Sequence, residues 1–121
     1  MTAAQPLMIL VAGPYRSGTD GDPARIQANV DAMTSVSLAL YRRGHLPVMG
    51  EWFALPLIEE ATRAGDGGDA FEEIFHPVSE RLVERCDACL RIGGPSEGAD
   101  RMVATARRLG KTVFTDLAEI P

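Results

Sequence analysis

Two glycine-containing segments carry the residue types that bind anions. The first is residues 93–100 (GGPSEGAD), which link a short apolar run, 88–92, to an amphipathic segment. Ser96 can cap a helix that begins there, and Gly94 and Gly98 allow a ligand to approach the backbone closely. Several free N–H groups and the positive end of a helix dipole would then point into one cleft. This segment therefore predicts an anion-binding site.

A second segment of the same kind, residues 12–18 (AGPYRSG), follows the other strongly apolar run, 7–11. Its candidate ligand contacts are Gly13, Tyr15, Arg16 and Ser17. An exposed loop explains Arg16 and Ser17 equally well, and simple packing explains Tyr15 equally well. Two such loops at strand ends indicate a ligand that carries a phosphate or a sugar.

The elements that must position these loops alternate along the chain. Short apolar runs predict strands over residues 7–12, 45–49, 88–92 and 112–114. Helices are predicted to begin at Pro23, at Glu51, near Phe71 and after Ser96. We expect Pro56 in the first turn of its helix or at the end of a short preceding turn. Pro77 is expected to restart the third helix, and residues 65–68 (GDGG) to form a turn.

This alternation predicts a single α/β domain over residues 1–121, a flavodoxin-like or Rossmann-like three-layer sandwich with a short parallel sheet. Such sheets bind ligands beyond the carboxyl ends of their strands, near the point where strand order reverses. Both glycine loops are expected there.

Composition and charge exclude several classes of partner. The net charge of −5 argues against binding to a nucleic-acid polymer. No apolar run approaches the roughly 20 residues that cross a bilayer, so we expect no membrane partner and a cytoplasmic location. Cys86 and Cys89 form one CxxC pattern with no second pair, which favours structural thiols. Neither a metal cluster nor the GxGxxG fingerprint occurs, so no cofactor is expected.

The segments VAGPY (11–15), RCDA (85–88), SEGA (96–99) and GKTV (110–113) give the chain a resemblance to a known family. It resembles a small member of the nucleoside 2-deoxyribosyltransferase superfamily, which includes the 2'-deoxynucleoside 5'-phosphate N-hydrolases. The resemblance implies cleavage or exchange of the bond between a base and a deoxyribose. It also implies a glutamate nucleophile, an assisting aspartate, phosphate recognition by the serine loop, and homo-oligomers that complete the site.

The chain departs from this family at both catalytic carboxylates. The nucleophile position is Met102 and the assisting position is Ser79. A thioether cannot form the glycosyl ester, so the usual covalent route is closed. Glu97 and Asp100 are the nearest substitutes, although acids in a first helical turn are also explained by the helix dipole. The spacing of Met102 with Ala99, Val103 and Ala106 predicts that it packs in the core.

Three further sequence features bear on the site. Glu51 is a candidate ligand for ribose hydroxyls, with first-turn capping as the alternative. His76 could line the cleft but is more typical of a structural role, and we expect His45 at the surface. Residues 52–55 (WFAL) are hard to bury in a small domain, which favours a homo-oligomer.

The sequence therefore predicts nucleoside or nucleotide binding. If the protein is an enzyme, the expected reaction is N-glycosidic hydrolysis or deoxyribosyl transfer on a nucleoside 5'-monophosphate. The alternative is a non-catalytic nucleotide- or phosphosugar-binding module. A carboxylate of Glu97 or Asp100 that points into a cleft beside Ser96 would favour catalysis.

Overall fold

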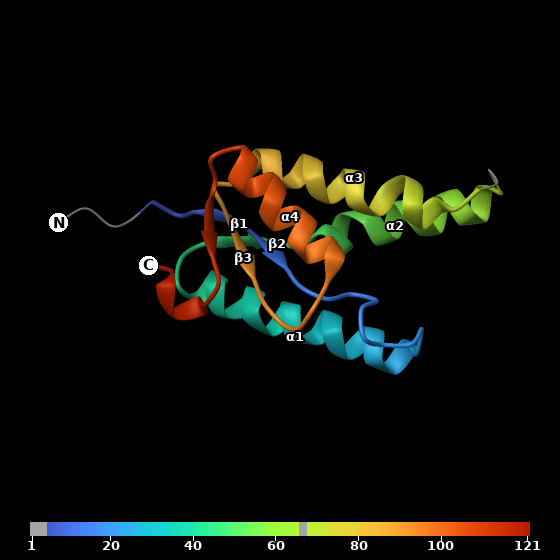
Figure 1. Ribbon diagram of the computed structural model, residues 1–121, viewed down its shortest axis with the longest axis horizontal. Helices are drawn as coiled ribbons and strands as arrows, with labels where there is room; N and C mark the ends of the chain where they lie inside the picture. The colour runs from blue at the N-terminus through green and yellow to red at the C-terminus, as the bar shows by residue number, and fades with distance from the viewer. Residues whose placement is uncertain (1–4, 66–67) are drawn as a thin grey trace.

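A computed structural model describes residues 5–65 and 68–121 (Figure 1). Its strands are β1 (Met8–Ala12), β2 (Leu46–Val48), β3 (Ala88–Arg91) and β4 (Thr112–Phe114). Its helices are α1 (Pro23–Arg42), α2 (Gly50–Ala64), α3 (Ala70–Arg85), α4 (Glu97–Arg108) and the short 3₁₀ helix η1 (Leu117–Glu119). The predicted alternation of strands and helices is confirmed.

The sheet has the order β2-β1-β3-β4, and every pair of neighbouring strands is parallel. β1 lies between β2 and β3. The second strand is therefore added on one side of β1, and the third strand is added on the other side. β1 and β3 pair from Ile9 with Ala88 to Ala12 with Arg91. The loops after these two neighbouring strands therefore leave the same edge of the sheet, where strand order reverses.

Helices cover both faces of the sheet and create two apolar cores. Figure 1 shows α1 on one side and α3 and α4 on the other. Ile9 and Val11 of β1 pack with Met33 and Leu40 of α1, whereas Leu10 packs with residues of α3 and α4. Alternate side chains of a strand point to opposite faces, so burial on both faces requires a continuously apolar strand. The predicted three-layer α/β sandwich is thus confirmed.

Local capping explains where α1 begins. The side chain of Asp22 accepts a hydrogen bond of 3.0 Å from the N–H of Ala24, and Pro23 occupies the first helical position. Proline fits there because its missing N–H would be unpaired in any case. The predicted start of this helix at Pro23 is confirmed.

The predictions for the two internal prolines are wrong. α3 continues from Ala70 to Arg85 without a restart at Pro77, and Pro56 lies well inside α2 rather than in its first turn. A proline inside a helix removes one hydrogen bond and costs about 3 kcal/mol. α2 and α3 pack along one another (Figure 1), and this packing offsets that cost. Of the predicted 65–68 turn, Asp66 and Gly67 lie outside the described residues.

The expectation of a surface position for His45 is also wrong. His45 is buried, and its Nδ1 accepts a hydrogen bond of 3.0 Å from the N–H of Leu7. The ring thereby satisfies a backbone donor just before β1 begins. This contact could not be inferred from the position of His45 beside a helix end.

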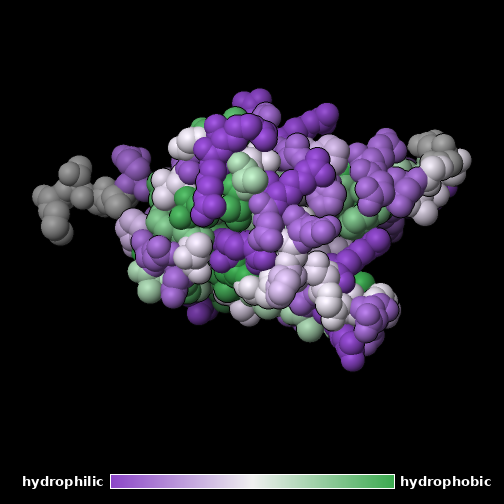
Figure 2. Space-filling model, in the orientation of Figure 1, coloured by the Kyte–Doolittle hydropathy of each residue, from purple (hydrophilic) through white to green (hydrophobic). Residues whose placement is uncertain are grey.

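The surface of the protein is mainly polar on the face drawn in Figure 2, and its two cysteines are buried. Figure 2 shows a mainly hydrophilic face with smaller apolar patches. None of the described helices is long and apolar enough to span a bilayer. Cys86 and Cys89 are free and buried, and burial raises the pKa of these thiols to about 11 and about 12, so both stay protonated at neutral pH.

Candidate functional site

A cleft of about 210 Å³ opens beyond the carboxyl ends of the strands. The end of β1 and its following loop form one wall, and the first residues of α2 together with α3 and the first turns of α4 form the rest. This is the edge where the sequence predicts ligand binding. Of the predicted site residues, the lining includes Gly13, Tyr15, Arg16, Ser17, Glu51, Ser96, Glu97 and Gly98.

The first turn of α4 presents backbone donors to this cleft. Ser96 is the N-cap, and its buried Oγ accepts a hydrogen bond of 3.1 Å from the N–H of Ala99. The N–H of Asp100 donates to the carbonyl of Ser96 at 3.0 Å. The first helical N–H groups have no intrahelical partner, so those of Glu97 and Gly98 are available to a ligand. An anion is the natural occupant.

Arg91, at the end of β3, braces the loop before α4. Its Nη2 donates to the carbonyl of Gly94 at 2.8 Å, its Nη1 donates to the carbonyl of Ile92, and its Nε pairs with Asp100 at 3.1 Å. Asp100 is 71% exposed and does not line the cleft, and neither does Gly94. The structure therefore brings Glu97 to the cleft but not Asp100.

The two glycine loops pack directly against each other. Gly93 has a φ of +78°, and a Cβ at this position would lie 2.7 Å from Cδ of Pro14. Only glycine combines this left-handed backbone with such a close approach. The contact holds the loop after β1 against the loop after β3.

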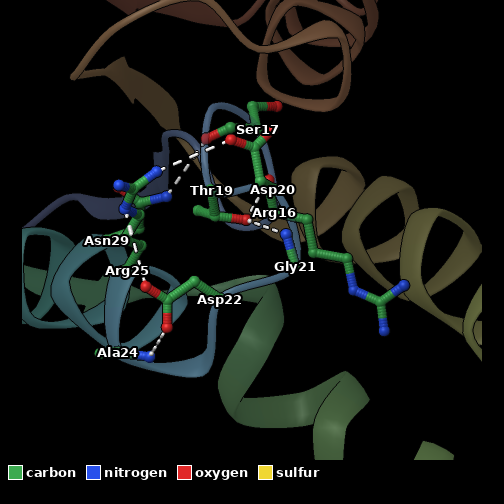
Figure 3. A network of polar contacts seen from close by, with 9 residues as sticks. All are labelled: Arg16, Ser17, Thr19, Asp20, Gly21, Asp22, Ala24, Arg25 and Asn29. Carbon is green, nitrogen blue, oxygen red and sulfur yellow. Dashed lines mark hydrogen bonds and ion pairs between the residues drawn. The ribbon is translucent and has the colours of Figure 1, made fainter.

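Hydrogen bonds from α1 and from within the loop itself hold the loop after β1, and Figure 3 draws this network without Tyr15. Asn29 donates to the carbonyl of Tyr15 at 2.9 Å, and Thr19 Oγ1 donates to the carbonyl of Arg16 at 2.6 Å. The Arg16 side chain extends away from this network in Figure 3 and lies with its guanidinium carbon 3.8 Å from the centre of the Phe71 ring. A cation–π contact places this positive charge at the cleft.

Three stacked aromatic rings form one side of the cleft. The ring centres of Tyr15 and Phe75 are 5.3 Å apart, and those of Phe75 and Phe71 are 4.6 Å apart. The sequence did not predict that Phe71 and Phe75 line the cleft. Their spacing of four residues on α3 places them on one helix face, but that pattern is also typical of core packing.

Glu51 is the most buried carboxyl group at the cleft, with 6% of the residue exposed. Desolvation by burial raises its pKa to about 7, although the residue's own backbone N–H lowers it. The close approach of α2 to α3 fixes its position, since a Cβ on Gly50 would lie 2.1 Å from Ser79 Oγ. A carboxyl group that titrates near neutral pH can donate or accept a proton.

Met102 and Ser79, the positions predicted from the sequence resemblance to match the family's carboxylates, both line the cleft. Met102 also packs in the core, as its helical spacing allows, and Ser79 donates to the carbonyl of Phe75 at 3.1 Å. His76 lines the cleft as well, and its Cε1 would lie 2.9 Å from a Cβ on Gly98. Within residues 5–65 and 68–121, no cluster of three or more possible ligands could hold a metal ion.

Comparison of the chain with models of known protein families finds no match, and comparison with curated proteins finds none either. The function of the protein must therefore be inferred from the geometry of its own cleft.

Proposed function

We propose that this cleft binds a nucleoside or nucleotide, and a nucleoside 5'-monophosphate in particular. The observation that carries the proposal is the meeting of three features at one opening. The free N–H groups of Glu97 and Gly98 suit the phosphate, Arg16 adds a positive charge, and the ring of Tyr15 offers a stacking surface for a base. The resemblance to the deoxyribosyltransferase superfamily points to the same ligand class.

The size of the cleft is consistent with a ligand of this class that is only partly enclosed. About 210 Å³ is less than the roughly 300–1,000 Å³ typical of pockets that enclose a drug-sized molecule. The enclosed part therefore holds the sugar and phosphate, and the base lies toward the aromatic rings.

N-glycosidic hydrolysis, or deoxyribosyl transfer, is the reaction that this arrangement suits best. Cleavage of such a bond develops an oxocarbenium-like charge, which a carboxylate stabilises. Glu97 lines the cleft and can take this role. A covalent glycosyl intermediate is not expected, because Met102 has no group that could form the ester.

A non-catalytic nucleotide- or phosphosugar-binding module is the second candidate. Two observations favour it: Asp100 is paired with Arg91 outside the cleft, and Glu97 is exposed rather than held by neighbours. A protein that kept the contacts to phosphate and sugar but had no positioned carboxylate would bind the nucleotide or phosphosugar without cleaving it.

We also propose that the protein acts as a homo-oligomer in the cytoplasm. Trp52 and Phe53 of α2 are 44% and 45% exposed, and Phe53 lines an apolar groove with Leu57 and Leu82. Burying such a surface against a second copy removes apolar area from water.

A thermal-shift titration tests the binding proposal. Nucleoside 5'-monophosphates should raise the melting temperature by several degrees, since ligand at 100 times its Kd contributes about 2.7 kcal/mol. The Arg16→Gln variant should lose most of this shift. Arg108→Gln, at the opposite end of α4 and exposed, is the matched control and should retain it. No shift with any phosphate-bearing nucleoside would refute the proposal.

A further inference from the structure

Glu51 is buried at the cleft without the partners that normally stabilise a buried carboxylate. Among the described residues, no salt bridge and no hydrogen bond from another residue reaches its carboxyl group, which has only its own backbone N–H as a partner. Leu10, Phe75 and Met102 contribute apolar surface to the same cleft. Burial of a carboxylate is costly unless the group is paired, and an isolated group responds by taking up a proton.

A purely structural role for Glu51 does not account for this position. An acidic side chain in the first turn of a helix interacts favourably with the helix dipole. It can do so equally well when it is exposed to solvent and keeps its hydration. Glu51 is instead buried in the wall of the cleft, next to the point where Gly50 of α2 contacts Ser79 of α3. The cost of burying it is explained if a ligand in the cleft needs an acid at this place.

We propose that Glu51 is the proton donor for N-glycosidic cleavage in this cleft, an inference that rests on the proposed function. As the bond between the anomeric carbon and the base nitrogen breaks, the neutral carboxyl group of Glu51 gives its proton to that nitrogen. Water forms the new bond to the anomeric carbon and releases a proton, which returns to the Glu51 carboxylate. The products are the free base and the sugar phosphate, and the enzyme is regenerated.

Four other ionisable groups of the described residues line the cleft. Arg16 and Tyr15 face it from the loop after β1, His76 from α3 and Glu97 from α4. Arg16 stays charged and cannot donate. Glu97 is exposed at the N-terminus of α4, where a negative charge interacts favourably with the helix dipole, so it suits charge stabilisation. The raised pKa of Glu51, about 7, keeps a large neutral fraction at physiological pH.

The test compares two substrates that differ in their need for a proton. The four common 2'-deoxynucleoside 5'-monophosphates release a base that must be protonated, whereas a 4-nitrophenyl 2-deoxyriboside 5-phosphate releases a stable anion. Glu51→Gln should lower kcat by about 100-fold or more on the nucleotides, and far less on the nitrophenyl substrate. Glu59→Gln, an exposed position on α2 outside the cleft, is the matched control and should leave both rates unchanged.

The pH profile and nucleotide binding give independent readouts. The wild-type kcat on nucleotides should fall as pH rises through about 7, because the active form is protonated, and Glu51→Gln should lose this dependence. Calorimetric nucleotide binding should survive the Glu51→Gln change. Equal loss on both substrates, or no loss, would overturn the assignment of Glu51. Binding without any cleavage by the wild type would overturn it and leave the binding proposal intact, whereas absence of binding would refute both.

Discussion

The buried carboxyl group of Glu51 reduces the stability of the folded protein when it is ionised. Its pKa is raised from 4.5 to about 7 by burial, so folding favours the protonated form. Stability is greatest below about pH 4.5 with respect to this group and is lost as pH rises to about 7. A shift of this size corresponds to roughly 3 kcal/mol.

Glu51→Gln should therefore stabilise the protein above pH 7 by up to about 3 kcal/mol. The amide keeps the shape of the side chain and cannot ionise. Chemical denaturation at pH 5 and pH 8 measures the effect, and the difference from wild type should grow between these values. A destabilised variant at pH 8 would show that the carboxylate is compensated in a way that this structure does not contain.

Arg91 should matter for the ligand although it does not line the cleft. Arg91→Met removes the donors to the carbonyls of Ile92 and Gly94, which shape the loop before α4. We expect a loss of about 1–2 kcal/mol in the free energy of unfolding and weaker phosphate binding. Asp100→Asn removes only the exposed partner and should have a small effect. Equal effects of both variants on binding would contradict a bracing role.

The aromatic stack of the β1 loop and α3 should recognise the base and not the phosphate. Tyr15→Leu should weaken binding of a nucleoside monophosphate by about 10- to 100-fold, since stacking contributes about 1–3 kcal/mol per base. Binding of inorganic phosphate should not change. Tyr41→Leu, an exposed position on α1, serves as the control. Calorimetry that shows equal losses for phosphate and nucleotide would contradict this division.

The elements differ in how well the sequence predicts them. The apolar run of β1 and the proline and cap of α1 are local signals, and the structure confirms both. Pro56 and Pro77 are misleading because packing between α2 and α3 outweighs a local penalty. Both glycine loops could be located from sequence, because glycines after short apolar runs mark strand ends in such folds.

Which side chains enter the cleft is harder to predict than where the cleft lies. Glu97 and Asp100 both belong to the first turn of α4, and the sequence does not distinguish them. In the structure, Asp100 pairs with Arg91 outside the cleft, whereas Glu97 lines the cleft. Glu51 could be marked as a candidate, but its burial depends on the close contact between Gly50 and Ser79, residues far apart in the chain. Such tertiary contacts have no local signal.

At the scale of the whole molecule, α2 presents Trp52, Phe53 and Leu57 at the surface, with 44%, 45% and 53% of each residue exposed. If this surface is an interface, light scattering at micromolar concentration should report a dimer or larger species. Phe53→Glu should shift the population to monomer, because it places a charge in the apolar groove with Leu57 and Leu82. Leu109→Glu, exposed after α4, is the control. A wild type that stays monomeric would refute the interface.

Backbone NMR of the wild type, titrated with a 2'-deoxynucleoside 5'-monophosphate, tests most directly whether the cleft binds nucleotides through α4. The largest amide shifts should occur at Glu97 and Gly98, whose N–H groups are free at the helix start. The same titration with the unphosphorylated nucleoside should move these two amides far less. Shifts that spare both amides, or that are equal with and without the phosphate, would contradict the proposed function.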